Sequence, residues 1–377
     1  MKVLHIIPSL RTGGAERLVL DICNELRKQG HEVKLVYFHD RNDYRYLSEQ
    51  INPQFLPVHV RPSVMGKWDI NLKPLNELIG SFKPQVIHSH LFEAEILSHE
   101  NIFEGTRYFS HCHDNMPQLR NFSFETIFQK SRLTDFYEKQ HLIKKYLKSD
   151  NKFIAISRDT KQYFENVLPE KLSRNVVLLN NAIDFERFNA VYQKRELGSL
   201  RMINVGSFVA KKNQQFLVEV VNALVEKNVD VKLTMLGDGP LLEDVKQKIK
   251  ELGLQKFIEC KGNVENVEQY LKEANLYVHS ATYEPFGLVL LEAMATGLPV
   301  VSLDGRGNRD IMKDGENGFV LKEQDTAAFA EKIELAYKNR ELYNTLSSGA
   351  LQTAKTYNIS DYVKKLIVLY QSSLVKD

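Results

Sequence analysis

The sequence predicts an α/β protein built from two Rossmann-like domains, each with a parallel sheet. Strand-length apolar segments alternate with helix-length segments, which is typical of parallel sheets covered on both faces. The same plan restarts after a polar stretch near the middle of the chain. A length of 377 residues with 43% hydrophobic content exceeds one ordinary core. We expect the two domains to face a central cleft, because ligands of such sheets bind beyond the carboxyl ends of the strands.

The first half opens with a buried strand, a glycine loop and a helix, at residues 2–7, 8–14 and 15–28. The other strands predicted in this half lie at 32–38, 54–60, 85–88, 107–110, 152–156 and 175–179. Residues 186–197 are polar and charged and lack a strand pattern, so we expect the hinge there. The first domain is therefore predicted to span residues 1–190.

The second half repeats the order of strand, loop and helix. Strands are predicted at 201–205, 231–236, 257–261, 276–279, 299–303 and 318–321, with helices at 214–226 and 241–252. The second domain is predicted to span residues 191–359. A last helix at 360–374 has no strand after it.

Composition excludes several classes of protein. Fifty basic and 48 acidic residues leave a net charge of +2, without the basic excess of a nucleic-acid binder. Cys23, Cys112 and Cys260 are widely separated, which favours a reducing compartment and argues against a structural zinc site. No apolar run approaches the roughly 18 residues of a membrane span, and the N-terminal run is too short for a signal peptide. We expect a cytoplasmic protein.

The stretch at residues 283–302 carries the clearest chemical signal. Glu284 precedes a Pro-Phe-Gly turn, and Glu292 interrupts an otherwise apolar helix. The backbone amides of residues 287–289 are predicted at the helix N-terminus, where they would be unpaired and positively polarised. A carboxylate in an apolar helix needs hydrogen-bonding partners, and a ligand facing the turn would supply them for both acids.

Glu284 and Glu292 resemble the E-x7-E pair of the retaining GT-B glycosyltransferases of family four. The flanking E-A-M-A-x-G-x-P-V-V segment is similar to that family nearly letter for letter. The resemblance implies that the last helix, 360–377, crosses back to the first domain. It also implies that Glu292 holds the ribose hydroxyls, while Glu284 and the amides of Phe286, Gly287 and Leu288 hold the sugar of a nucleoside diphosphate sugar.

A lysine loop at residues 206–213 carries further chemistry. A fixed cation beside a helix N-terminus suits a diphosphate leaving group, whose developing charge it would stabilise. The loop resembles the family's G-R-L-x-x-x-K-G/N segment, which matches Lys212 to the family lysine. Ser207 stands where the family has arginine. We expect no metal and no cofactor, because no D-x-D motif lies where an ion would bridge the diphosphate.

Two H-x-H pairs, His88 with His90 and His111 with His113, could each place two imidazoles on one face of a strand. A metal-dependent hydrolase also begins from such a pair, but it would require further ligands, for which the second half shows no matching residue. By resemblance, one histidine after a strand of the first domain contacts the transferred sugar. The match favours His113, with His111 as its rival.

The first glycine loop resembles the family's G-G-A-E-R segment. Gly13 and Gly14 lack a Cβ, so the backbone there could approach a phosphate or sugar, and Gly14 is expected to face the diphosphate. Arg306 stands where the family has glycine. We interpret it as the phosphate contact that Ser207 cannot make, with recognition of an anionic acceptor as the alternative.

The resemblance thus implies a hexosyltransferase that moves a sugar from a UDP- or GDP-linked donor to a glycan or lipid-linked saccharide, with retention, in surface polysaccharide or glycoconjugate biosynthesis. A nucleotide-sugar epimerase and a non-catalytic sugar-nucleotide binding protein are the alternatives. Residues 128–152 carry a basic, partly apolar helical pattern. A core-facing helix is the preferred interpretation, and peripheral contact with the inner face of the membrane is its alternative.

Overall fold

The computed structural model describes residues 1–61, 69–120, 130–192 and 198–375. Contacts divide the chain into two compact units, Met1–Asn181 with Ile359–Asp377, and Ala182–Asn358. The first boundary thus lies before residue 190, because helix α8 (Phe185–Asn189) packs against α12 of the second unit. The expected hinge at 186–197 therefore begins with a helix of the second unit, and its residues 193–197 lie outside the described residues.

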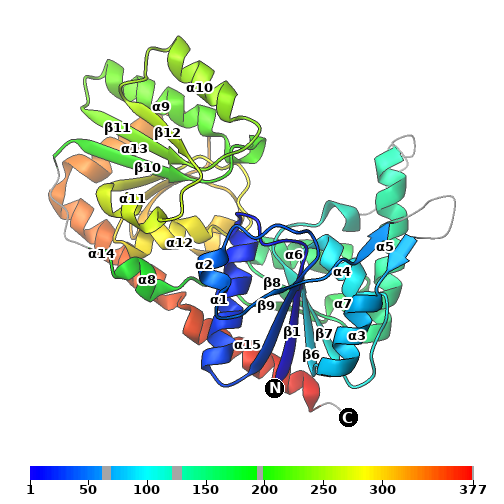
Figure 1. The fold of residues 1–377 in the computed structure, drawn as a ribbon. Coiled ribbons are helices and arrows are strands. Elements are labelled where there is room, and N and C mark those ends of the chain that lie inside the picture. The colour runs from blue at the N-terminus through cyan, green and yellow to red at the C-terminus, as the bar shows by residue number, and fades with distance from the viewer. Residues whose placement is uncertain (62–68, 121–129, 193–197, 376–377) are drawn as a thin grey trace. The chain divides into compact units, whose positions relative to one another are not determined.

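The first unit is organised around a seven-stranded parallel sheet in the order β3-β2-β1-β6-β7-β8-β9 (Figure 1). Its strands are β1 (Lys2–Ile7), β2 (Glu32–Tyr37), β3 (Gln54–Phe55), β6 (Val86–His90), β7 (Arg107–Cys112), β8 (Lys152–Ala155) and β9 (Val176–Leu178). The strand expected at 54–60 is two pieces, since β4 (His59–Arg61) leaves the sheet and pairs with β5 (Asp69–Asn71). Pro57 lies between β3 and β4 and has no N–H to continue the ladder.

Helices cover both faces of this sheet (Figure 1). They are α1 (Gly14–Lys28), α2 (Arg45–Ser48), α3 (Lys73–Phe82), α4 (Phe92–His99), α5 (Lys130–Ser149), α6 (Arg158–Val167), α7 (Glu170–Ser173) and α15 (Ile359–Leu374). Leu4 and Ile6 of β1 pack against α3 and α4, so His5 between them faces the side of α1 and α15. The C-terminal helix α15 belongs to this unit, as the resemblance implies.

Helix α5 is core-facing along its second half. Leu142, Ile143 and Tyr146 are buried in one cluster with residues of β7 and β8. Phe136 and Tyr137 in the first half of the helix remain exposed. The described residues contain no helix that combines the length and the apolar character needed to cross a bilayer.

The second unit holds a six-stranded parallel sheet in the order β12-β11-β10-β13-β14-β15. Its strands are β10 (Leu200–Val205), β11 (Val231–Leu236), β12 (Ile258–Gly262), β13 (Leu276–His279), β14 (Val300–Leu303) and β15 (Gly318–Leu321). Its longer helices are α9 (Gln214–Glu226), α10 (Leu242–Glu251), α11 (Val267–Glu273), α12 (Leu288–Ala295), α13 (Thr326–Lys338) and α14 (Arg340–Thr356). The predicted class of two Rossmann-like parallel-sheet domains is confirmed.

A buried carboxyl group lies on the α4 and α5 side of the first sheet. Glu95 of α4 is fully buried and accepts hydrogen bonds from the Ser110 hydroxyl at 2.5 Å and the Tyr146 hydroxyl at 3.2 Å. Burial raises the pKa of Glu95 to about 8, more than these hydrogen bonds lower it. The side chain is therefore neutral in the folded protein at pH 7.

Replacing Glu95 with glutamine should remove a pH dependence of stability. Between the ordinary pKa of 4.5 and the folded value of about 8, the folded state holds a proton that the unfolded state has lost. Glu95 should therefore make the free energy of unfolding fall as pH rises through this window, by up to about 1.4 kcal/mol per pH unit. Below the ordinary histidine pKa of 6.5, the buried histidines with lowered pKa values act in the opposite direction. Urea unfolding between pH 7 and 8 should therefore show this fall in the parent but a flatter profile in Glu95→Gln.

The control is Glu93→Gln, an exposed glutamate of the same helix. It should keep the parental slope. Equal slopes in the parent and in Glu95→Gln would contradict the assignment of the proton to Glu95.

Candidate functional site

The turn before α12 has the geometry that the sequence predicted. Gly287 is the N-cap of α12 and has φ 105° and ψ 54°, in the left-handed region that favours glycine. A Cβ on Gly287 would also lie 2.9 Å from Leu290 Cδ1. The helix therefore begins at Leu288, and its first N–H groups point toward the turn that carries Glu284.

A second loop packs directly on this turn. The Glu284 N–H donates to the Gly305 carbonyl at 2.8 Å, and Glu284 and Arg306 form an isolated parallel bridge. A Cβ on Gly307 would lie 2.0 Å from the Pro285 carbonyl oxygen, so only glycine permits this approach. The glycines around Arg306 thus serve close backbone packing against the turn.

Glu284, Lys212 and His279 form one buried charged cluster. The Lys212 Nζ lies 2.5 Å from Glu284 Oε2, and His279 Nε2 lies 3.1 Å from the same oxygen. Burial by itself raises the pKa of Glu284, but the Lys212 ammonium and His279 outweigh it and hold that pKa below its usual range. Glu284 is therefore a carboxylate, able only to accept hydrogen bonds.

The lysine loop holds Lys212 in place. Lys212 ends a short 3₁₀ turn (Ala210–Lys212) after β10, and the Ser280 hydroxyl donates to its carbonyl at 2.7 Å. Sequence reasoning missed His279. Its position at the carboxyl end of β13, five residues before Glu284, was the available signal, because parallel strands present such residues at one edge.

Tyr277 of β13 is a buried phenol in the same unit as the E-x7-E pair. Its hydroxyl donates to the Val205 carbonyl at 3.2 Å. Burial raises the pKa of Tyr277 well above its ordinary value, and the charges of Glu284 and Glu292 raise it further. Glu292 is half-buried in the second turn of α12.

The other predicted donor residues of this unit divide into buried and exposed groups. The Phe286 ring is buried and packs edge-on against Tyr357, so only its backbone is available to a ligand. Leu288 is half-buried, while Ser207 and Arg306 are exposed. Arg306 has φ 71°, and its N–H donates to the Asp304 carboxylate at 3.0 Å. The structure thus places Arg306 beside Glu284. Glu284 in turn contacts Lys212, which lies in the lysine loop that also contains Ser207.

The glycine loop of the first unit differs from expectation in one respect. A Cβ on Gly13 would lie 2.3 Å from Glu16 Oε2, so the Glu16 side chain fills the space that we assigned to a ligand. The Gly13 N–H also donates to the Tyr44 hydroxyl at 3.0 Å. Helix α1 begins at Gly14. The missing Cβ of Gly13 therefore accommodates Glu16, and the loop's approach to phosphate stays a prediction for Gly14.

Five buried histidines share one face of the first sheet. Strand register pairs His5 with His88 and His90 with His111, and His113 follows β7 directly. Tyr370 of α15 lies over them, with its hydroxyl 2.6 Å from His88 Nδ1. This set is called the histidine face below. The sequence placed each H-x-H pair on one side of a strand, but the additional His5 was not predicted.

The ring nitrogens of the histidine face lie close together. Two triplets, His5 with His88 and His90, and His90 with His111 and His113, place ring nitrogens within 4.8 Å of one another. Some ring pairs stack, with interplanar angles of 5° to 27°, and the others are tilted by 32° to 39°. Within both triplets, neighbouring ring nitrogens already form direct contacts of 2.9 Å with each other.

Burial keeps these imidazoles neutral. It lowers the pKa of His5 to about 3 and that of His111 to about 4, and it places those of His88, His90 and His113 well below the ordinary value. Mutual repulsion between the rings acts in the same direction. The histidine face therefore offers hydrogen bonds without positive charge at neutral pH.

His111 and His113 differ in their access to a ligand. His111 Nε2 lies 3.1 Å from Asn181 Oδ1, and its Nδ1 is buried. His113 uses Nε2 within the face, and it retains 9% exposure. The geometry therefore favours His113 over His111 as the ligand contact.

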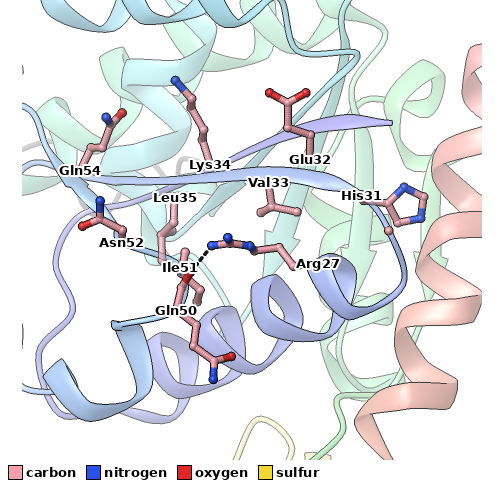
Figure 2. A pocket seen from close by; sticks show the side chains of 11 residues that line it. Arg27, His31, Glu32, Val33, Lys34, Leu35, Gln50, Ile51, Asn52 and Gln54 are labelled. Carbon is pink, nitrogen blue, oxygen red and sulfur yellow. Dashed lines mark hydrogen bonds between the residues drawn. The ribbon is translucent and has the colours of Figure 1, made fainter.

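A cavity of about 600 Å³ lies elsewhere in the first unit (Figure 2). Figure 2 shows Arg27 of α1 reaching toward the Gln50 carbonyl, with Val33 and Leu35 of β2 on the same side of that strand as Arg27. These residues adjoin the start of β2, whereas Gly14 and His113 follow the carboxyl ends of their strands. The cavity therefore contains none of the predicted site residues.

Two family models match the chain. The model of Glycosyltransferase Family 4 matches residues 12–187, and that of glycosyl transferases group 1 matches residues 188–353. EpsD of Bacillus subtilis (strain 168), named as a glycosyltransferase, is 31% identical over 166 residues, 44% of this chain and 44% of its own length. An Escherichia coli protein named UDP-Gal:alpha-D-GlcNAc-diphosphoundecaprenol alpha-1,3-galactosyltransferase is 22% identical over 100% of this chain and 98% of its own.

Solved structures agree in fold. The crystal structure of Anabaena Alr3699/HepE in complex with UDP and glucose aligns with a TM-score of 0.78 at 20% identity, over 99% of this chain and 100% of that chain. The chain belongs to the group 1 glycosyltransferases, and its fold is GT-B. The predicted class, a glycosyltransferase, is confirmed.

Proposed function

We propose that the protein is a retaining hexosyltransferase that moves a sugar from a UDP- or GDP-linked donor to a glycan or lipid-linked saccharide acceptor. The observation that carries this proposal is the cluster of Lys212, Glu284 and His279 beside the N-terminus of α12. It combines a fixed cation, a carboxylate and the N-terminal amides of a helix, which are groups suited to a diphosphate sugar. The names of the relatives, which mention UDP and a diphosphoundecaprenol acceptor, support the same substrate classes.

In the proposed reaction, the bond between the anomeric carbon and the diphosphate oxygen breaks. The acceptor hydroxyl oxygen bonds to the same face of that carbon, and its proton passes to the departing phosphate. Lys212 and the helix amides stabilise the charge that develops on the leaving group. Glu284 accepts hydrogen bonds from sugar hydroxyls, and His113 contacts the sugar from the first unit.

The family assignment favours transfer over the epimerase and binding-protein alternatives. Product formation that depends on acceptor distinguishes transfer from both. We further propose a role in surface polysaccharide or glycoconjugate biosynthesis, at the cytoplasmic side. Peripheral contact of α5 with anionic lipid, through its exposed Phe136 and Tyr137, stays a hypothesis that vesicle co-sedimentation at low salt would test.

Glu292→Ala should weaken nucleotide binding. A panel of nucleotide sugars in thermal-shift assays first identifies the donor, because a ligand at 100 times its Kd adds about 2.7 kcal/mol of stability. Glu292 is proposed to hold two ribose hydroxyls through charge-assisted hydrogen bonds, each contributing roughly 1.5–3 kcal/mol. Calorimetry should therefore show weaker binding of both the free nucleotide and the nucleotide sugar.

The matched control is Glu334→Ala, which removes a glutamate of α13 that pairs with Lys227 and Lys338. It should leave both affinities at the parental values. Unchanged affinities in Glu292→Ala would refute the ribose assignment.

Transfer should persist in excess chelator. The proposed leaving-group cation is Lys212, which Glu284 and the Ser280 hydroxyl hold in place, so no divalent ion is required. Initial rates with and without EDTA should agree within a factor of about two, since the same transition-state contacts remain. Loss of activity that magnesium or zinc restores would instead assign the charge stabilisation to a metal ion.

Arg306→Ala should lower turnover by roughly 10²–10³-fold if its guanidinium contacts the leaving group. Ser207 and Arg306 follow β10 and β14 of one parallel sheet, and such loops gather at the same edge. Adding Ser207→Arg to Arg306→Ala should then recover part of the loss.

Donor hydrolysis in the absence of acceptor separates the two roles of Arg306. It should fall in Arg306→Ala if the residue serves the donor. An unchanged rate of donor hydrolysis in Arg306→Ala would show that Arg306 serves an anionic acceptor. It would contradict the proposal that Arg306 compensates for Ser207.

A further inference from the structure

Three members of the histidine face form a continuous hydrogen-bonded chain. His5 Nδ1 lies 2.9 Å from His90 Nε2, and His90 Nδ1 lies 2.9 Å from His113 Nε2. A neutral imidazole carries one N–H and one lone pair, so His90 must donate at one end and accept at the other. The three tautomers are therefore coupled, and only two arrangements satisfy both contacts.

In the first arrangement the protons point from His5 toward His113. His5 donates through Nδ1, His90 donates through Nδ1, and His113 accepts at Nε2 and carries its proton on Nδ1. In the second arrangement every proton is reversed, and His113 carries its proton on Nε2. The choice between them decides whether the exposed side of His113 is a donor or an acceptor.

The buried end of the chain discriminates between the two arrangements. His5 Nε2 is buried and has no hydrogen-bond partner among the described residues. The first arrangement leaves a lone pair there, and the second leaves an N–H. Buried N–H groups without an acceptor are rarer in native proteins than acceptors with unused lone pairs, so the first arrangement is favoured.

We propose that His5 and His90 are positioning residues that hold His113 as the Nδ1–H tautomer, so that it presents a hydrogen-bond donor to a hydroxyl oxygen of the transferred sugar. The part of this proposal that concerns the sugar rests on the proposed transferase function, whereas the tautomer does not. A donor at this position fixes the sugar but cannot remove a proton from it.

Burial supports the coupling. All three rings are at most 9% exposed, and desolvation keeps their pKa values below the ordinary one. An imidazolium, which would donate from both nitrogens and break the chain, is therefore excluded at neutral pH. His88 shares the strand, face and burial of His90, but its hydrogen-bond partner is Tyr370 and not His113.

Nitrogen NMR of the free protein tests the tautomer directly. Ring nitrogens are labelled with ¹⁵N in all histidines, and the His113 signals are assigned from their absence in His113→Gln. The parent should show a protonated Nδ1 and an unprotonated Nε2 for His113 at pH 7. The reverse pattern would overturn the proposal, whether or not the protein transfers sugar.

Two matched variants test the positioning roles. His90→Met replaces the donor to His113 Nε2 with a thioether that can only accept, and should make a protonated Nε2 appear at His113, while His88→Met should keep the parental pattern. With donor and acceptor, His90→Met should lower kcat about tenfold or more, as loss of an orienting partner does for other functional histidines, with a smaller change in donor KM. An unchanged His113 tautomer in His90→Met would refute the positioning role.

If the parent transfers no sugar under any condition, the proposed function fails while the nitrogen spectrum still decides the tautomer. If transfer occurs but the spectrum shows Nε2–H, the function stands and the positioning proposal falls. The two failures are therefore distinguishable.

Discussion

The ion pair between Lys212 and Glu284 is the interaction on which the second unit's site depends. Taking two charges out of water costs several kcal/mol per ion, and only close geometry with further partners offsets that cost. The structure supplies the geometry through backbone contacts: Ser280 holds the Lys212 carbonyl, and the Gly305 carbonyl accepts from the Glu284 N–H. The glycines at 287, 305 and 307 follow from this requirement, since each lies where a side chain would strain the turn or displace its neighbour.

The first unit manages buried polar groups in the opposite way, by keeping them neutral. Histidines line the α1 and α15 side of its sheet, and Glu95 lies on the α4 side, with the pKa of every one of these groups shifted toward the uncharged form. Neutral groups require only hydrogen bonds, which Tyr370, Asn181, Ser110 and Tyr146 provide. Burying ionisable groups costs free energy in both units. The second unit offsets that cost by pairing opposite charges, and the first unit offsets it by keeping the groups uncharged.

Much of the architecture was predictable because most strands contain a short apolar segment between helix-length segments. The strands at 231–236, 276–279 and 318–321 and the helix at 214–226 have the predicted bounds. Errors arose where local pattern and long-range contact conflict. Pro57 divides an apolar stretch into two strands. Helix α8 belongs to the second unit because it contacts α12, and the local sequence of α8 does not indicate that contact.

By itself, the sequence determined the fold class, the family and the residues of the E-x7-E turn, because periodicity, glycine turns and motif spacing are local properties of the chain. Only the tertiary structure decided which side chains meet. Parallel register aligns His5 with His88 and His90 with His111, although these residues are far apart in the chain, and it brings His279 to Glu284. Likewise, the sequence alone suggested that the backbone at Gly13 could approach a phosphate. In the folded protein, the Glu16 carboxylate occupies the space beside Gly13. The burial, charge and tautomer of a side chain depend on such neighbours, and these neighbours come from segments that are distant in the sequence and pack together only in the folded protein.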